Sequence, residues 1–119
     1  MNYFGTFGST ESEALRLLMP VVDRALHAHQ IGNYQEYFSV ITSDLAAKVT
    51  EKGFLQAHRE VAPQLGTLQS KSFLASLRRD ENIMLLFSAK FSGTEDDIVI
   101  NVTFKNGTEP PLIEWLWIE

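Results

Sequence analysis

The stretch IMLLFSAKFSGTEDDIVINVTF, residues 83–104, carries the clearest structural signal in the chain. Apolar side chains take every second position on both sides of a short polar segment, and this alternation is typical of strands with one buried face. The positions assigned to the buried face are Ile83, Leu85, Phe87, Ala89, Phe91, Ile98, Ile100, Val102 and Phe104. The stretch therefore predicts two antiparallel strands, over 83–91 and 98–104, joined by a solvated turn.

Two more strands are predicted around this pair. A less regular one covers 68–78, and the last covers 112–118. Asn106-Gly107 predicts a hairpin turn before the last strand, because both residues accept a positive φ, and Pro110-Pro111 is expected to delay pairing until Leu112. The second half of the chain is thus expected to be a four-stranded antiparallel meander.

Helical spacing dominates the first half of the chain. Thr10 and Glu13 form a capping box, and apolar positions three or four residues apart continue from there to Gly32. Pro20 lies inside this pattern and predicts a kink or a break, because proline removes one backbone hydrogen bond.

Two shorter helical signals and a third helix follow. Asn33 caps a segment over 34–41, and Ser43 or Asp44 is expected to cap a short turn through residue 49. Thr50 caps the third helix, which Pro63 and Gly66 end.

Together these signals predict an α+β fold with three N-terminal helices packed on one face of a curved four-stranded antiparallel meander sheet. A chain of 119 residues with 45% hydrophobic and 21% charged residues suits a single globular domain over residues 1–119. Residues 1–9 are expected to be a poorly ordered lead-in.

Charge and composition exclude several classes of protein. The formal net charge is −5 and Arg78-Arg79 is the only adjacent basic pair, whereas nucleic-acid binders carry a basic stripe. The chain has no cysteine, no apolar run long enough to cross a membrane and no signal-peptide pattern. We therefore expect a cytoplasmic protein without nucleic-acid or membrane partners.

The last strand is apolar on both faces. Ile113, Trp115 and Trp117 alternate with Leu112, Leu116 and Ile118, so one set must point away from the helices. Strands with two apolar faces are usually covered on both. A second copy of the chain is the expected cover, giving a homodimer. The predicted interface residues are Met84, Leu86, Val99, Trp115 and Trp117.

Candidate ligand-binding residues are few. Tyr34 and Tyr37 could direct hydroxyl groups into a pocket, although packing of their rings against the sheet with the hydroxyls at the surface is the simpler explanation. Glu114 is a carboxylate in a strand, and it could act as a base or as an exposed edge charge. His58 lies alone on the apolar side of the third helix, and no set of three or four convergent ligands predicts a metal site. No cofactor is expected.

The order of elements, with Gly32-Asn33-Tyr34 opening the second helix and Leu65-Gly66 preceding the first long strand, resembles the nuclear transport factor 2 superfamily. The run that continues through Phe38, Leu45, Thr50 and Phe54 resembles sequences of its small uncharacterised bacterial branches. This superfamily includes ketosteroid isomerase and the polyketide cyclases, and cystatin-like proteins share a similar arrangement. The resemblance implies a curved sheet, a pocket between sheet and helices, and dimerisation through the open sheet face.

The sequence favours a non-enzymatic module that binds a small apolar ligand or a protein and dimerises through the open sheet face. The ligand residues would be Tyr34, Tyr37, His58 and Glu114. The alternative is an enzyme of the ketosteroid-isomerase or polyketide-cyclase type, in which Glu114 acts with Tyr34 or Tyr37. A domain that docks on a larger enzyme or secretion partner is a third possibility.

Overall fold

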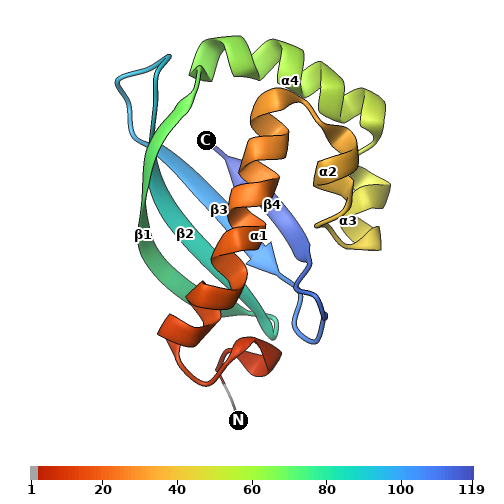
Figure 1. Ribbon diagram of the computed structural model, residues 1–119, viewed down its shortest axis with the longest axis vertical. Helices are drawn as coiled ribbons and strands as arrows, with labels where there is room; N and C mark the ends of the chain where they lie inside the picture. The colour runs from red at the N-terminus through yellow and green to blue at the C-terminus, as the bar shows by residue number, and fades with distance from the viewer. Residues whose placement is uncertain (1–2) are drawn as a thin grey trace.

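The computed structural model describes residues 3–119 and places four α-helices before a four-stranded antiparallel sheet (Figure 1). The helices are α1 (Glu11–Ile31), α2 (Tyr34–Phe38), α3 (Ser43–Lys48) and α4 (Glu51–Leu65), after a short 3-10 turn η1 (Gly5–Phe7). The strands are β1 (Leu68–Arg79), β2 (Asn82–Phe91), β3 (Ile98–Phe104) and β4 (Ile113–Ile118). The predicted α+β class and the order of helices before strands are confirmed.

Each α-helix starts at a side chain that accepts a hydrogen bond from the backbone N–H three residues later. The caps are Thr10, Asn33, Thr42 and Thr50. Thr42, and not Ser43 or Asp44, caps α3, and its buried hydroxyl accepts from the Leu45 N–H at 3.1 Å. The short turn expected through residue 49 is a separate helix, α3.

Helix α1 is continuous through Pro20. The expected break is absent because Leu18 and Val22, on either side of the proline, share one buried face. Packing against the sheet thus holds both halves of the helix in line. On the neighbouring β1, Lys71 forms an ion pair with Asp23 of α1 at 2.6 Å.

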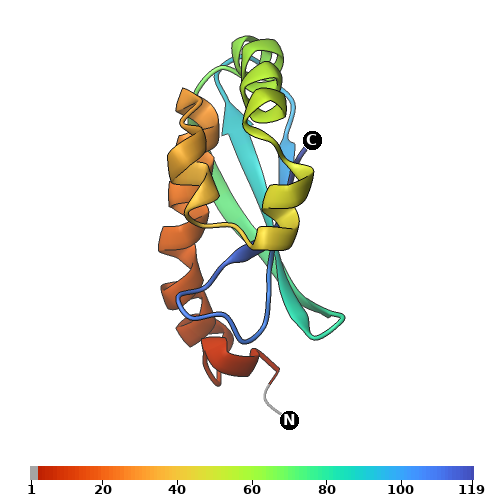
Figure 2. The same cartoon turned by 90° about the vertical axis from the view of Figure 1, so that its right-hand side faces the viewer.

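The sheet has the order β1-β2-β3-β4 with every neighbouring pair antiparallel. Its inner face carries the side chains predicted from the alternation, and most of them are fully buried beneath α1 and the loops around it. Figure 2 shows α1 and α2 on one side of the sheet, and among residues 3–119 no helix covers the other side. We call this uncovered side the outer face.

The shortest connection in the sheet joins β1 to β2. Asp80 and Glu81 connect β1 to β2 and both have positive φ, 54° and 68°. Of the predicted pair Asn106-Gly107, only Gly107 has positive φ, at 86°, and the pair belongs to the longer connection over 105–112. The turn at Asn106-Gly107 therefore lies where it was predicted, and pairing resumes after Pro110-Pro111 as expected, where the Lys105 N–H donates to the Leu112 carbonyl at 3.1 Å.

The N-terminal residues differ from the expected lead-in. Phe4 and Phe7 flank and close η1 and are buried, and the Phe7 ring lies 6.1 Å from that of Phe104 in an edge-to-face contact. Their spacing puts both rings on one side of a single turn, so the segment extends the core. Residues 1–2 lie outside the described part of the chain.

A short backbone contact joins the helical half to the last strand. The Thr42 N–H donates to the Ile113 carbonyl at 2.9 Å, and the Ile113 N–H donates to the Val40 carbonyl at 2.8 Å. Residue Ile41 thereby forms a parallel bridge with Ile113. Residues 40–42 thus cover the start of the edge of β4 that does not pair with β3. The rest of that edge faces the space beside α3 and α4 (Figure 1).

Candidate functional site

The outer face of the sheet carries two cross-strand rows without a charged side chain. One row is Leu77, Met84, Thr103 and Trp115, and the next is Ala75, Leu86, Asn101 and Trp117. Leu77, Trp115 and Trp117 are 40%, 42% and 50% exposed. The tryptophan rings stack 6.3 Å apart and within 8° of parallel. A row below adds Val99, which is also exposed.

All five residues predicted for an interface therefore lie on this one face. The structure also assigns the two sides of β4, which the sequence leaves open. Leu116 and Ile118 are half-buried and pack against the core, while Trp115 and Trp117 face outward. An apolar surface of this kind on a described face without cover is typical of a site of association.

A second candidate site is a groove of about 480 Å³ between β4 and α3–α4. We call it the β4–α4 groove. Its lining residues are His29, Tyr37, Leu45, Lys48, Val49, Thr50, Gly53, Phe54, Ala57, Val61, Leu65, Trp115, Leu116, Trp117 and Ile118. Its volume is in the range of ordinary ligand sites, and Lys48 is the one acidic or basic residue besides His29 in this lining.

Three aromatic side chains from different helices pack together at the groove. Tyr37 of α2 stacks on Phe54 of α4 with ring centroids 4.9 Å apart, and His29 of α1 meets Phe54 edge-on at 5.5 Å. Burial, with a smaller effect from Tyr34, raises the pKa of Tyr37 to about 12. Burial, and next the charge of His58, lowers the pKa of His29. Both groups are therefore neutral at pH 7 and could exchange hydrogen bonds with an uncharged ligand.

The structure does not bring the predicted ligand residues together in one cavity. Of the four, only Tyr37 lines the groove. The Tyr34 hydroxyl donates to the Val49 carbonyl at 3.0 Å, and the His58 Nδ1 lies 3.1 Å from the His29 carbonyl oxygen. Glu114 is half-buried in β4, and its Oε2 has no hydrogen-bond partner within the described residues.

Sequence reasoning missed the residues that form the walls of the groove. Phe54, Val61 and Leu65 of α4 line the groove. Leu116 and Ile118 gave no separate signal, because they alternate with Trp115 and Trp117, which are also apolar. The spacing of apolar residues on α4 could have indicated one side of the groove. That β4 forms the opposite side follows from tertiary packing and not from the sequence pattern.

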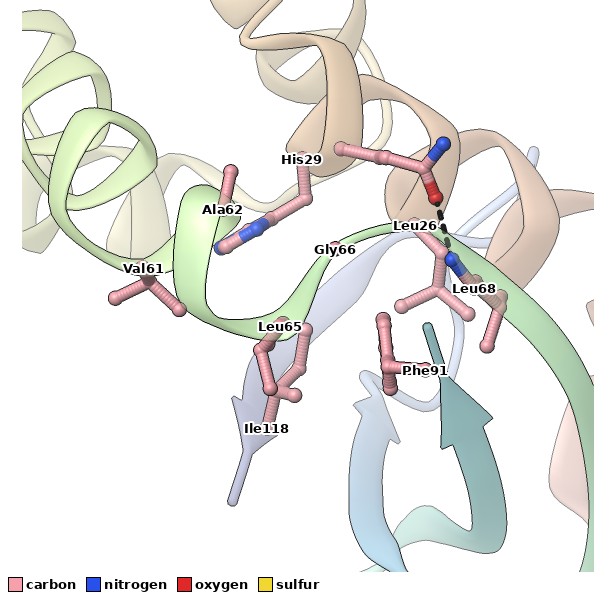
Figure 3. Close-up of a pocket in the computed structure, with 10 residues that line it drawn as sticks. Leu26, His29, Val61, Ala62, Leu65, Gly66, Leu68, Phe91 and Ile118 are labelled. Carbon is pink, nitrogen blue, oxygen red and sulfur yellow. Dashed lines mark hydrogen bonds between the residues drawn. The ribbon is translucent and has the colours of Figure 1, made fainter. Parts of the chain in front are cut away.

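A smaller cavity lies behind the groove. It measures about 30 Å³ and shares His29, Val61, Leu65 and Ile118 with the groove (Figure 3). The Leu68 N–H donates to the Gln30 Oε1 at 3.0 Å beside it. This cavity has room for about one water molecule, so it is a packing defect and not a ligand site.

Comparisons with protein-family models, with curated proteins and with solved structures find no match. Within residues 3–119, no three histidine, aspartate or glutamate side chains are grouped so that they could hold a metal ion. None of the helices in that range has the length and apolar character needed to cross a membrane. The two candidate surfaces must therefore be interpreted from their own chemistry.

Proposed function

We propose that this protein is a non-enzymatic interaction module that works as a homodimer joined through the outer faces of its sheets. The observation that carries this proposal is the pair of uncharged rows across all four strands. Trp115 and Trp117 are the residue type that most often dominates the energy of an interface. The expected nuclear transport factor 2-like architecture supports the same surface, since its members often dimerise there.

A two-fold axis through the outer face would place each copy's rows on those of the other copy. Removing apolar surface from water contributes about 25 cal/mol per Å². None of the eight side chains in the two rows would have to give up the hydration of a full charge, which is the main cost of burying polar surface. The outer face therefore suits a stable contact between identical surfaces.

Sedimentation equilibrium of the wild type and two variants tests this proposal. Leu86→Glu puts a charge in the centre of the two rows, and we expect it to convert a dimer at micromolar concentration into a monomer. Phe38→Glu is the matched control, because Phe38 is exposed on α2 and away from the sheet. A monomeric wild type, or a Leu86→Glu variant that remains a folded dimer by circular dichroism and sedimentation, would contradict the proposal.

A second candidate function is an isomerase- or cyclase-like enzyme acting on an apolar small molecule. One observation favours it: the neutral phenol of Tyr37 lies beside the neutral imidazole of His29 on an apolar groove, with the rings 6.1 Å apart. Glu114 is not among the lining residues, so His29 would have to accept the proton. A naphthol probe whose fluorescence changes with wild type but not with Tyr37→Phe would support this candidate.

A further inference from the structure

We propose that the β4–α4 groove binds an extended peptide segment of another protein, apolar at alternate residues, as an added strand on the free edge of β4. This inference goes beyond the dimer, because the hydrogen bonds would be made by the edge of β4 and not by the outer face, although Trp115 and Trp117 border both surfaces. Three observations support it: the direction of the backbone groups of β4, the pairing already present at one end of that edge, and the shape of the groove.

The hydrogen-bond pattern of β4 leaves two residues with free backbone groups. Val99 and Glu119 exchange both of their backbone hydrogen bonds, at 2.7 and 2.9 Å. In an antiparallel ladder such bonded pairs alternate with pairs whose N–H and C=O groups point away from each other. Counting back from Glu119, Ile118 and Leu116 fall on the outward-pointing positions. Within residues 3–119 no backbone group bonds to either of them on that side.

These free groups open onto the groove, since Leu116 and Ile118 both line it. The chain itself shows that this edge accepts an added segment. Residues 40–42 pair with Ile113 in the parallel direction before the chain turns away into α3. A peptide beyond that point would continue the pairing with Leu116 and Ile118, which is the way that many recognition domains bind extended ligands.

The groove restricts the occupant to a single strand. Helices α3 and α4 stand beside the edge of β4 (Figure 1), so the edge of a second sheet with its own helices would collide with them. Alternate side chains of a single strand would face opposite sides. One set would enter the groove toward Phe54 and Ala57, and the other would lie beside Trp117 on the outer face.

The test uses the wild-type protein and arrays of hexapeptides with valine, leucine, isoleucine or phenylalanine at every second position and threonine between them. The best binder is then made in two N-methylated forms, each blocking one alternate set of amides. Strand addition predicts that one form loses binding by about tenfold or more while the other keeps it. No binding from the array, or equal effects of the two methylation patterns, would overturn the proposal.

Hydrogen exchange supplies a second readout on the same complex. We expect the peptide to slow exchange of the Leu116 and Ile118 amides, while the Trp117 amide, which already bonds to β3, is slow with and without it. Binding that protects neither amide, including occupation of the groove by a small apolar molecule alone, would contradict strand addition.

Two substitutions on α4 complete the test. Ala57→Trp fills the groove from its half-buried position and is expected to weaken peptide binding by about tenfold or more. Gln56→Trp is the matched control on an exposed position of the same helix. Peptide binding in the Leu86→Glu variant should equal that of the wild type, so failure of this proposal and failure of the dimer are distinguishable.

Discussion

The Tyr37 ring lies against the Phe54 ring with centroids 4.9 Å apart and planes inclined by 30°. This contact joins α2 to α4 and leaves Tyr37 only 3% exposed. A phenol in such a setting resists ionisation, because the phenolate would lose its hydration. The pair is therefore both a packing contact and a source of pH dependence.

We expect the free energy of unfolding to fall as pH rises above 10, partly because of Tyr37. Its pKa is about 12 in the folded protein against an ordinary value of 10.0, so the unfolded chain loses the proton first. Below pH 10 the tyrosine is protonated in both states and has no effect. Urea unfolding should show a loss of roughly 1 kcal/mol for each pH unit above 10 that is absent in Tyr37→Phe. Tyr3→Phe, at an exposed position, should keep the wild-type slope.

His29 predicts a second pH dependence on the acidic side. Burial lowers its pKa from the ordinary 6.5, so the unfolded chain takes up a proton before the folded protein does. Stability should be unaffected by His29 above that value and should be lost as pH falls below it. The unfolding temperature should fall less between about pH 7 and about pH 5 in His29→Phe than in the wild type. The same slope in both proteins would disprove the prediction, and His27→Asn at an exposed position of α1 is the control.

The turn between β1 and β2 should be open to stabilisation. Glu81 has φ of 68°, a conformation that costs an L-residue about 1 kcal/mol or more. We expect Glu81→Gly to raise the free energy of unfolding by about 0.5–1 kcal/mol in urea denaturation. Gly107→Ala is the converse control: its added Cβ would meet no atom within 4 Å, yet φ of 86° should make it destabilising by about 1 kcal/mol. A change of the same sign in the free energy of unfolding for both substitutions would contradict this account.

The caps of α3 and α4 form another matched pair. Thr42 is buried and Thr50 is exposed, and each hydroxyl accepts one N–H at 3.1 Å. Thr42→Ala would leave the Leu45 N–H without a partner and out of reach of water, so we expect a loss of about 2 kcal/mol in stability. Thr50→Ala should cost about 1 kcal/mol or less, since water can replace the hydroxyl. Chemical denaturation of both variants measures the difference.

Residues 83–104 illustrate why much of the fold could be predicted. Alternation over this stretch identified β3 with its observed ends, Ile98 and Phe104, and β2 to within one residue. The signal is strong because only one face of these strands is buried. The same rule fails for β4, where both faces are apolar and the side-chain pattern cannot tell inside from outside.

The candidate groove was beyond such reasoning for a related cause. The free backbone groups of Leu116 and Ile118 follow from the register between β3 and β4, including a shift between Thr103 and Phe104. The register, and which residues of a strand direct their backbone groups toward the neighbouring strand, are properties of paired strands and cannot be read from the sequence. The outer face was easier to predict, because placing Met84, Leu86 and Val99 on it requires only the alternation of side chains along β2 and β3.

The bridge between Ile41 and Ile113 has a consequence for how the chain acquires its structure. It joins two segments from opposite halves of the polypeptide, and such non-local contacts slow folding because a long loop must close before they form. During synthesis the helices emerge while the strand that receives residues 40–42 is still missing. The apolar faces of the helices therefore stay uncovered until the strands follow, and apolar surface exposed in that interval favours association with other chains.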